Sequence, residues 1–207
     1  MAYELFPDPA PKLSLAGLEP FAKGTKRHCY VHPDDTDLCI KVPARANDER
    51  CLIEHQMDLE DYRMLKQLGS DAVFERIPAI EGVVGTDKGI GIVVRLYRDA
   101  DHAISQKLSA HIVERGMTPP LVDAIDELKL WLGRHRLLTR DTGPHNVVAV
   151  DLSRNKWKLV IIEGWLNRRL RWLSKCHRTM CDYLIRRELR KFDRRTARVL
   201  AVYNSKS

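Results

Sequence analysis

The sequence predicts an α+β fold in which an N-terminal antiparallel sheet lobe precedes a mostly helical C-terminal lobe. Runs of β-forming residues crowd the first half of the chain, and helical spacing of apolar residues dominates the second half. Of 207 residues, 44% are hydrophobic, which is enough to build a core in one domain or in two small lobes that share a cleft. We expect an irregular arm over residues 1–14, an N-terminal lobe over 15–98 and a C-terminal lobe over 99–207.

The N-terminal lobe is expected to contain several strands and one helix. Clusters of β-branched and aromatic residues predict strands over residues 18–22, 28–32, 38–42, 80–86 and 90–96. Residues 32–37 form a turn by composition, and residues 87–89, with the sequence DKG, are typical of a hairpin turn. Residues 47–68 are rich in helix formers, and Gly69 marks the expected end of that helix.

The C-terminal lobe is expected to be helical around one small hairpin. Pro119 and Pro120 open a helix whose apolar residues recur at helical spacing. Two β-prone runs, 146–150 and 158–162, flank a turn at 153–155. From Trp165 onward the sequence predicts helix throughout.

Positive charge is concentrated in this last segment, a basic helical tail over residues 165–207. From Gly164 to the end there are 13 basic and 3 acidic residues, a net charge of +10, whereas the whole chain carries +7. The remainder is therefore slightly acidic, and the asymmetry suggests an anionic partner. Aromatic residues between arginines suit a helix on an anionic membrane surface, and secondarily a nucleic-acid surface. For the apolar residues of the tail we favour simple packing of the lobe, with solvated arginines around them.

Composition also narrows the cellular setting. The five cysteines form no CxxC pair, so neither a disulfide framework nor a zinc ribbon is indicated. The N-terminal segment lacks the basic and apolar regions of a secretory leader, and no apolar run is long enough to span a bilayer. We expect a cytoplasmic protein that can lie against the inner face of the membrane through its tail.

Residues suited to phosphate chemistry occur in a defined order. In loop 139–146, TRDTGPHN, Asp141 can accept a proton from a hydroxyl and Asn146 can bind a metal ion. Lys41 lies upstream within an apolar strand, where an ammonium needs an anionic partner. Glu163 ends a downstream apolar strand just before Gly164, and its carboxylate can hold Mg²⁺. Taken singly, each is also compatible with a purely local role in a turn or at a strand edge.

A lysine on a strand, an Asp/Asn loop and a strand-end acid before glycine form the ordered set of a protein-kinase-like fold. At these residues the chain resembles the YrbL family of bacterial kinase-like proteins, named for regulation within the PhoP network. The likeness is closest at residues 22–33, AKGTKRHCYVHP, and at residues 38–42, LCIKV. It continues through residues 85–91 to loop 139–146 and covers residues 16–165.

The resemblance implies a bilobal kinase-like fold with a reduced C-terminal lobe and a nucleotide site. The loop over the ATP phosphates would be residues 22–29, of which three are expected to contact phosphate: Gly24, Lys26 and Arg27. Lys41 would bind the α- and β-phosphates, and Leu96 would begin the hinge that meets adenine. The helix acid that pairs with Lys41 would be Asp58, with Glu54 and Glu60 as alternatives.

The resemblance also assigns the chemical step. Asp141 would be the catalytic base, acting with Lys41 and Asn146, and Mg²⁺ would be held by Asn146 and Glu163. Glu163 stands where kinases carry the aspartate of the DFG motif. The 44 residues that follow Glu163 leave no room for a long activation segment, which disfavours a protein substrate relative to a small or carbohydrate acceptor.

We therefore expect an ATP- and Mg²⁺-dependent phosphotransferase that acts on a hydroxyl acceptor of small-molecule, carbohydrate or protein type. The alternative is a pseudokinase, a regulatory binding module with little or no turnover. A second alternative is a protein that binds a membrane surface or a nucleic acid through the basic tail.

Overall fold

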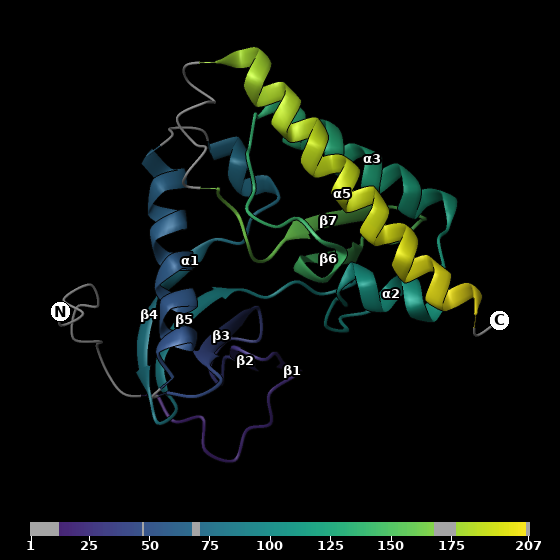
Figure 1. Cartoon of the computed structure of the whole chain (residues 1–207). Coiled ribbons are helices and arrows are strands. Elements are labelled where there is room, and N and C mark those ends of the chain that lie inside the picture. The colour runs from purple at the N-terminus through teal and green to yellow at the C-terminus, as the bar shows by residue number, and fades with distance from the viewer. Residues whose placement is uncertain (1–12, 47, 68–70, 168–176, 206–207) are drawn as a thin grey trace. The chain divides into compact units, whose positions relative to one another are not determined.

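A computed structural model of the chain describes residues 13–46, 48–67, 71–167 and 177–205 (Figure 1). It is an α+β structure with two compact units. The first comprises Met1–Arg63 and Pro78–Leu96, and the second comprises Met64–Ile77 and Tyr97–Ser207. The expected arm falls almost wholly outside the described residues, as does the helix stop at Gly69.

The first unit is built on a five-stranded antiparallel sheet with strand order β1-β2-β3-β5-β4. Its strands are β1 (Ala22–Lys23), β2 (Arg27–Val31), β3 (Leu38–Pro43), β4 (Ile80–Thr86) and β5 (Gly89–Arg95). Four of the five predicted strands are confirmed to within a residue or two. The predicted strand 18–22 is wrong except at Ala22, because Pro20 has no N–H for a ladder and Leu18 is 39% exposed.

The two faces of this sheet differ in chemistry. Cross-strand partners lie on the same face, and one face holds an apolar cluster of Leu15, Tyr30, Ile40, Val42 and Val93. The opposite face carries the register pairs Arg27–Pro43, Cys29–Lys41 and Cys39–Val94. Burial, together with the neighbouring Cys29 thiol, raises the pKa of Cys39 to about 12, so this thiol stays neutral. Two cations, Arg27 and Lys41, thus project from a face that is otherwise apolar.

Helix α1 (Glu49–Gln67) confirms the helix predicted over 47–68. Its buried stripe follows i, i+4, i+7, i+11 and i+14 spacing through Cys51, His55, Asp58, Tyr62 and Leu65. The stripe thus combines apolar side chains with the imidazole of His55 and the carboxylate of Asp58. Asp58 pairs with Arg27, which places this part of α1 over the charged face of the sheet.

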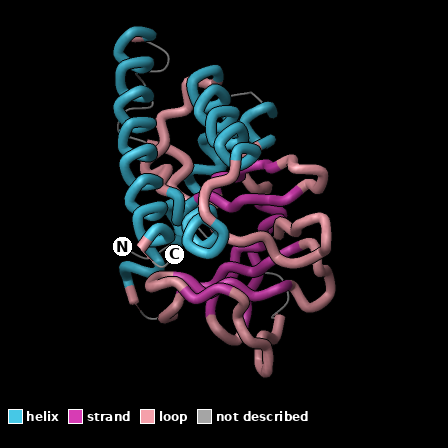
Figure 2. The backbone as a smooth tube through the Cα atoms, turned by 90° about the vertical axis from the view of Figure 1, so that its right-hand side faces the viewer, coloured by secondary structure: helices cyan, strands magenta, loops and turns pink. Residues whose placement is uncertain are grey.

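The second unit is mainly helical. It contains α2 (Leu108–Arg115), α3 (Pro119–Arg134), the hairpin β6 (Val147–Asp151) and β7 (Trp157–Ile161), and α5 (Arg178–Asn204), with the short 3-10 segments η1 (Asp71–Glu75) and η2 (Pro144–Asn146). Helix α5 packs along α2 and α3, as its yellow ribbon shows in Figure 1. In Figure 2 the same helix is the long cyan coil that descends to the C-terminus. The helix predicted from Pro119 and the hairpin predicted over 146–162 are confirmed, whereas α2 was not predicted.

The predicted start of the tail helix at Trp165 is wrong. The indole Nε1 of Trp165 donates to the Ile161 carbonyl at 2.8 Å, and the N–H of Asn167 donates to the Leu138 carbonyl at 2.7 Å. These groups therefore bond to other segments rather than to a helical turn. Helix α5 begins at Arg178, and residues 168–176 of the tail lie outside the described residues. Of the helices that are described, none is at once long enough and apolar enough to cross a membrane.

Candidate functional site

The loop around Asp141 joins α3 to β6 in the second unit and is bound to the chain near Glu163. The N–H groups of Arg140 and Asp141 both donate to the Gly164 carbonyl, at 2.9 and 3.4 Å. The N–H of Ile162 donates to the Asn146 carbonyl at 2.9 Å. Because both ends of the loop are tied to residues 162–164, the backbone brings together Asp141, Asn146 and Glu163, three of the residues singled out from the sequence.

Gly164 makes this approach possible. Its φ of +72° lies in the left-handed region, and a Cβ built on it would lie 2.7 Å from the Asp141 carbonyl oxygen. That distance is too short for any real side chain. The glycine after Glu163 is therefore required by the close passage of two backbone segments, which fixes the start of the Glu163 side chain beside the loop.

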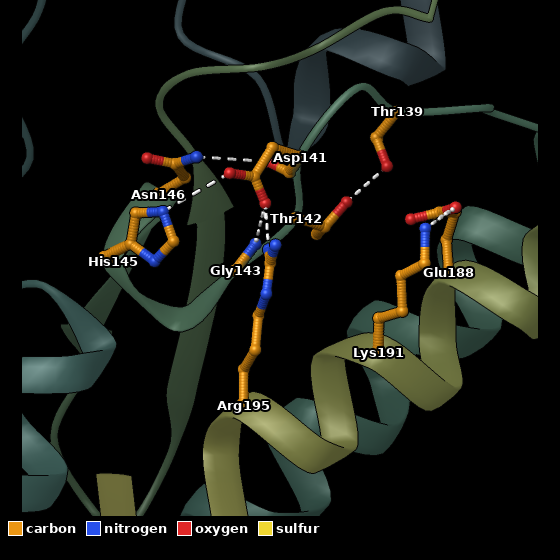
Figure 3. Close-up of polar contacts among 9 residues, drawn as sticks. All are labelled: Thr139, Asp141, Thr142, Gly143, His145, Asn146, Glu188, Lys191 and Arg195. Carbon is orange, nitrogen blue, oxygen red and sulfur yellow. Dashed lines mark hydrogen bonds and ion pairs between the residues drawn. The ribbon is translucent and has the colours of Figure 1, made fainter. Parts of the chain in front are cut away.

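The Asp141 carboxylate is held by three neighbours (Figure 3). Its Oδ1 accepts the N–H of Gly143 at 3.1 Å and pairs with the guanidinium of Arg195, which comes from α5. The His145 Nε2 lies 3.4 Å from Oδ2. The position of this carboxylate is thus fixed by its own loop and by the long C-terminal helix.

Arg195 is a residue of the site that the sequence analysis missed. The signal was present, because Arg195 continues the inner face of α5 that passes through the buried Cys181, Ile185 and Phe192 at helical spacing. A long cation at a position of that stripe needs an anionic partner inside the fold. The sequence analysis treated all arginines of the tail as one solvated group, so it did not distinguish Arg195 from the others.

The side-chain amide of Asn146 is oriented by one hydrogen bond. The side chain is buried, and its Nδ2 donates to the Asp141 carbonyl at 3.2 Å (Figure 3). This assigns the Oδ1 oxygen as the atom that can bind a cation. Within the ranges that the structure covers, no three His, Cys, Asp or Glu side chains cluster as a metal site. A magnesium ion here would therefore rest on Asn146, Glu163 and ligand phosphates, a set of oxygen donors that Mg²⁺ accepts.

The same loop contains a second, internal brace. The hydroxyls of Thr139 and Thr142 are buried and hydrogen-bonded to each other (Figure 3). This pair of hydroxyls thus braces the loop from within.

In the first unit, Arg27 and Asp58 form a buried ion pair, with side chains 6% and 2% exposed. The resemblance assigned Asp58 to Lys41 and placed Arg27 over the phosphates. The structure joins Asp58 to Arg27 and puts Lys41, which is also buried, on the same sheet face. The pairing of Asp58 with Lys41 stays a prediction.

The other predicted residues of this unit lie as follows. Lys26 pairs with Glu54 at 2.6 Å, and Glu60 accepts a hydrogen bond from Gln56. The N–H of Gly24 donates to the Arg27 carbonyl at 2.8 Å, which closes a tight turn between β1 and β2. The N–H of Leu96 donates to the Asp37 carbonyl at 2.7 Å, so only its carbonyl can serve as a hinge contact.

His55 lies within this charged layer and stays neutral. Burial first, and then the positive charges of Arg27 and Lys41, lower the pKa of His55 from 6.5 to about 3. The imidazole therefore carries no charge at neutral pH. This residue was not predicted as part of the site.

The buried histidine predicts how stability depends on pH. Unfolding frees His55 to bind a proton below its ordinary pKa of 6.5, whereas the folded form binds one only near pH 3. Stability is therefore full above pH 6.5 and falls as the pH drops toward 3. Between pH 6.5 and 5 we expect the wild type to lose about 2 kcal/mol that His55→Gln does not lose. Urea unfolding of both proteins across this range measures the difference, and parallel pH curves would contradict the assignment.

The fold and site define an α+β protein that joins a five-stranded antiparallel sheet to a helical unit carrying an aspartate–asparagine loop. The family described as PhoP regulatory network protein YrbL matches residues 13–197, and the chain belongs to this family. It is 26% identical over 147 residues to the protein named "Uncharacterized protein YrbL" of Escherichia coli (strain K12), covering 70% of this chain and 69% of that protein. The protein of the same name from Shigella flexneri matches with the same identity and coverage. The predicted membership of the YrbL family is thereby confirmed, whereas the kinase-like character stays a prediction.

Proposed function

We propose that this protein has a kinase-like bilobal fold, binds ATP with Mg²⁺ and transfers the γ-phosphate to a hydroxyl acceptor. One observation carries the proposal: loop 139–146 is tied by backbone hydrogen bonds to residues 162–164, which brings the backbone of Asp141 and Asn146 close to that of Glu163. Kinases use an aspartate of the catalytic loop to accept the hydroxyl proton, and a nearby asparagine and acid to hold metal.

Each residue of the second unit then has a stated task. Asp141 accepts the proton of the acceptor hydroxyl, while Gly143 and Arg195 fix the direction of its carboxylate. The Asn146 Oδ1 and the Glu163 carboxylate hold Mg²⁺, which neutralises charge on the phosphates when it is bound. The extra methylene of glutamate lets Glu163 reach a metal from a backbone position set farther back than that of an aspartate.

The first unit is proposed to supply the nucleotide contacts. Lys41 lies on the third strand and precedes the helix of its unit, which is the order of the phosphate-binding lysine in kinases. The tight turn at Gly24, with Lys26 beside it, would approach the phosphates, and the Leu96 carbonyl would meet adenine. The Arg27–Asp58 pair anchors α1 to the sheet. In kinases the ion pair between the strand lysine and a helix glutamate also connects the helix to the sheet.

A second candidate is a pseudokinase, and one contact favours it. Arg195 already engages Asp141, the carboxylate that an acceptor hydroxyl would have to approach. If α5 keeps this position when nucleotide is bound, the protein binds ATP as a regulatory module without turnover.

The proposal is tested by thermal unfolding with ATP and MgCl₂. A ligand at 100 times its dissociation constant stabilises the folded state by about 2.7 kcal/mol, so the melting temperature should rise by several degrees. Lys41→Ala should abolish the rise, Glu163→Gln should remove its magnesium dependence, and the exposed control Arg63→Ala should leave it intact.

Turnover is assayed as ADP release with and without candidate hydroxyl acceptors. Asp141→Asn should keep the thermal shift and lose ADP release, by about 100-fold or more. No shift at millimolar ATP would overturn nucleotide binding. A shift without turnover in either wild type or Glu163→Asp would select the pseudokinase.

A further inference from the structure

Helix α5 presents a row of arginines on the side away from its buried face. Arg186, Arg190, Arg194 and Arg198 follow one another at i, i+4 spacing, and all four are exposed. We call these four residues the arginine stripe. In the described part of the chain none of them makes an ion pair.

The acidic residues of α5 do not compensate this charge. Asp182 is 3.2 Å from Arg136, and Asp193 is 2.6 Å from Lys129, both outside the helix. Glu188 binds Lys191 at 2.7 Å within the helix. The stripe therefore contains three successive like-charged i, i+4 pairs, an arrangement that destabilises a helix.

The rotation of α5 about its axis is fixed, so the stripe cannot turn inward. The opposite face is buried in the second unit through Cys181, Leu184, Ile185, Phe192 and Thr196. Arg195 is held from the inner side by Asp141 (Figure 3). Since the apolar face packs inside the unit, α5 cannot lay that face into a bilayer as an interfacial helix does.

We propose that the arginine stripe binds the phosphate backbone of a single-stranded nucleic acid. From Arg186 to Arg198 the helix rises about 18 Å, so a strand laid along the stripe can place several phosphates within reach of its arginines. One guanidinium can donate two parallel hydrogen bonds to two oxygens of the same phosphate, and its planar geometry fits a phosphodiester. Tyr183 is 56% exposed and lies one turn before the stripe on the same side, where its ring can stack on a base.

The experiment measures fluorescence anisotropy of a labelled 20-nucleotide RNA with the full chain at several salt concentrations. Four phosphate contacts predict a slope of log K against log salt near −2.8, or about a 50-fold loss of affinity between 50 and 200 mM salt. Replacing the four stripe arginines with glutamine should weaken binding at 50 mM salt by more than tenfold and bring the slope close to zero. It should also leave the melting temperature unchanged or raised, because like-charge repulsion is removed.

A matched control removes the same charge elsewhere. Glutamine at four exposed positions outside α5, namely Arg50, Arg63, Arg95 and Lys156, should leave RNA affinity within about twofold of the wild type. Equal losses in the two quadruple variants would overturn the proposal, because they would show an effect of net charge alone. Binding to phosphatidylglycerol vesicles that needs the stripe, without binding to RNA, would replace the nucleic acid by a membrane surface. Binding to neither probe would overturn both.

Discussion

Arg27→Met should destabilise the first unit by about 3–5 kcal/mol, because it removes one partner of a buried ion pair and leaves the other charged. Asp58 is 2% exposed, and its Oδ1 already accepts no hydrogen bond within the described chain. Without the guanidinium, the carboxylate must stay charged in the core or take up a proton. Urea unfolding followed by circular dichroism measures the loss. A cost below about 1 kcal/mol would contradict a buried pair.

Two further variants separate the charge from the packing. The double variant Arg27→Met with Asp58→Leu removes both charges and should recover most of the stability lost in the single variant. Lys26→Met is the matched control, because Lys26 is adjacent in sequence and pairs with another acid of α1, but the pair is 48% and 25% exposed. A surface pair of this kind should be worth less than about 1 kcal/mol.

Arg27 also shows which part of the structure was accessible from sequence. Strands and turns followed from local chemistry: β4 and β5 were predicted because β-forming runs flank a glycine turn, and Gly89 has a φ of +105°. The sheet face on which Arg27 lies does not follow from local chemistry. It depends on the register of β2 against β3, and a shift of one residue would turn Arg27 to the apolar side. The motif resemblance placed Arg27 in a phosphate loop because the register of β2 against β3 is not visible in the motif.

The candidate site likewise contains residues that sequence order identified and residues that only the tertiary structure shows. Asp141, Asn146 and Glu163 were identified from their order in the sequence, and the backbone of the second unit brings them together. Arg195 lies 54 residues from Asp141 along the chain, and only the packing of α5 determines that they meet. Residue order thus predicted which residues the backbone brings together, whereas the neighbours that fix the Asp141 carboxylate required the tertiary structure.

The close passage of Gly164 and the backbone of Asp141 predicts a second large effect on stability. Gly164→Ala should destabilise the second unit by about 2–4 kcal/mol, of which about 1–2 kcal/mol is the cost of a left-handed residue with a side chain. The rest arises because the new Cβ would lie 2.7 Å from the Asp141 carbonyl oxygen and 3.2 Å from its nitrogen. Both are backbone atoms, so relief requires moving the loop. If the proposed function holds, the magnesium-dependent thermal shift with ATP should disappear in the same variant.

Two other glycines separate the cost of the backbone conformation from the cost of the steric clash. Gly17 has a similar φ of +78° with nothing within 4 Å of the added Cβ, so Gly17→Ala should cost only the conformational part, about 1–2 kcal/mol. Gly133 lies near the end of α3 with open space around it, and Gly133→Ala should stabilise the protein by about 0.5–1 kcal/mol. Urea unfolding of the three variants gives the comparison. If Gly164→Ala costs no more than Gly17→Ala, the two backbone segments do not pass this closely, and Glu163 is not held beside Asp141. If it costs more, the excess measures the clash between the new Cβ and the backbone of Asp141, and therefore how closely the two segments pass.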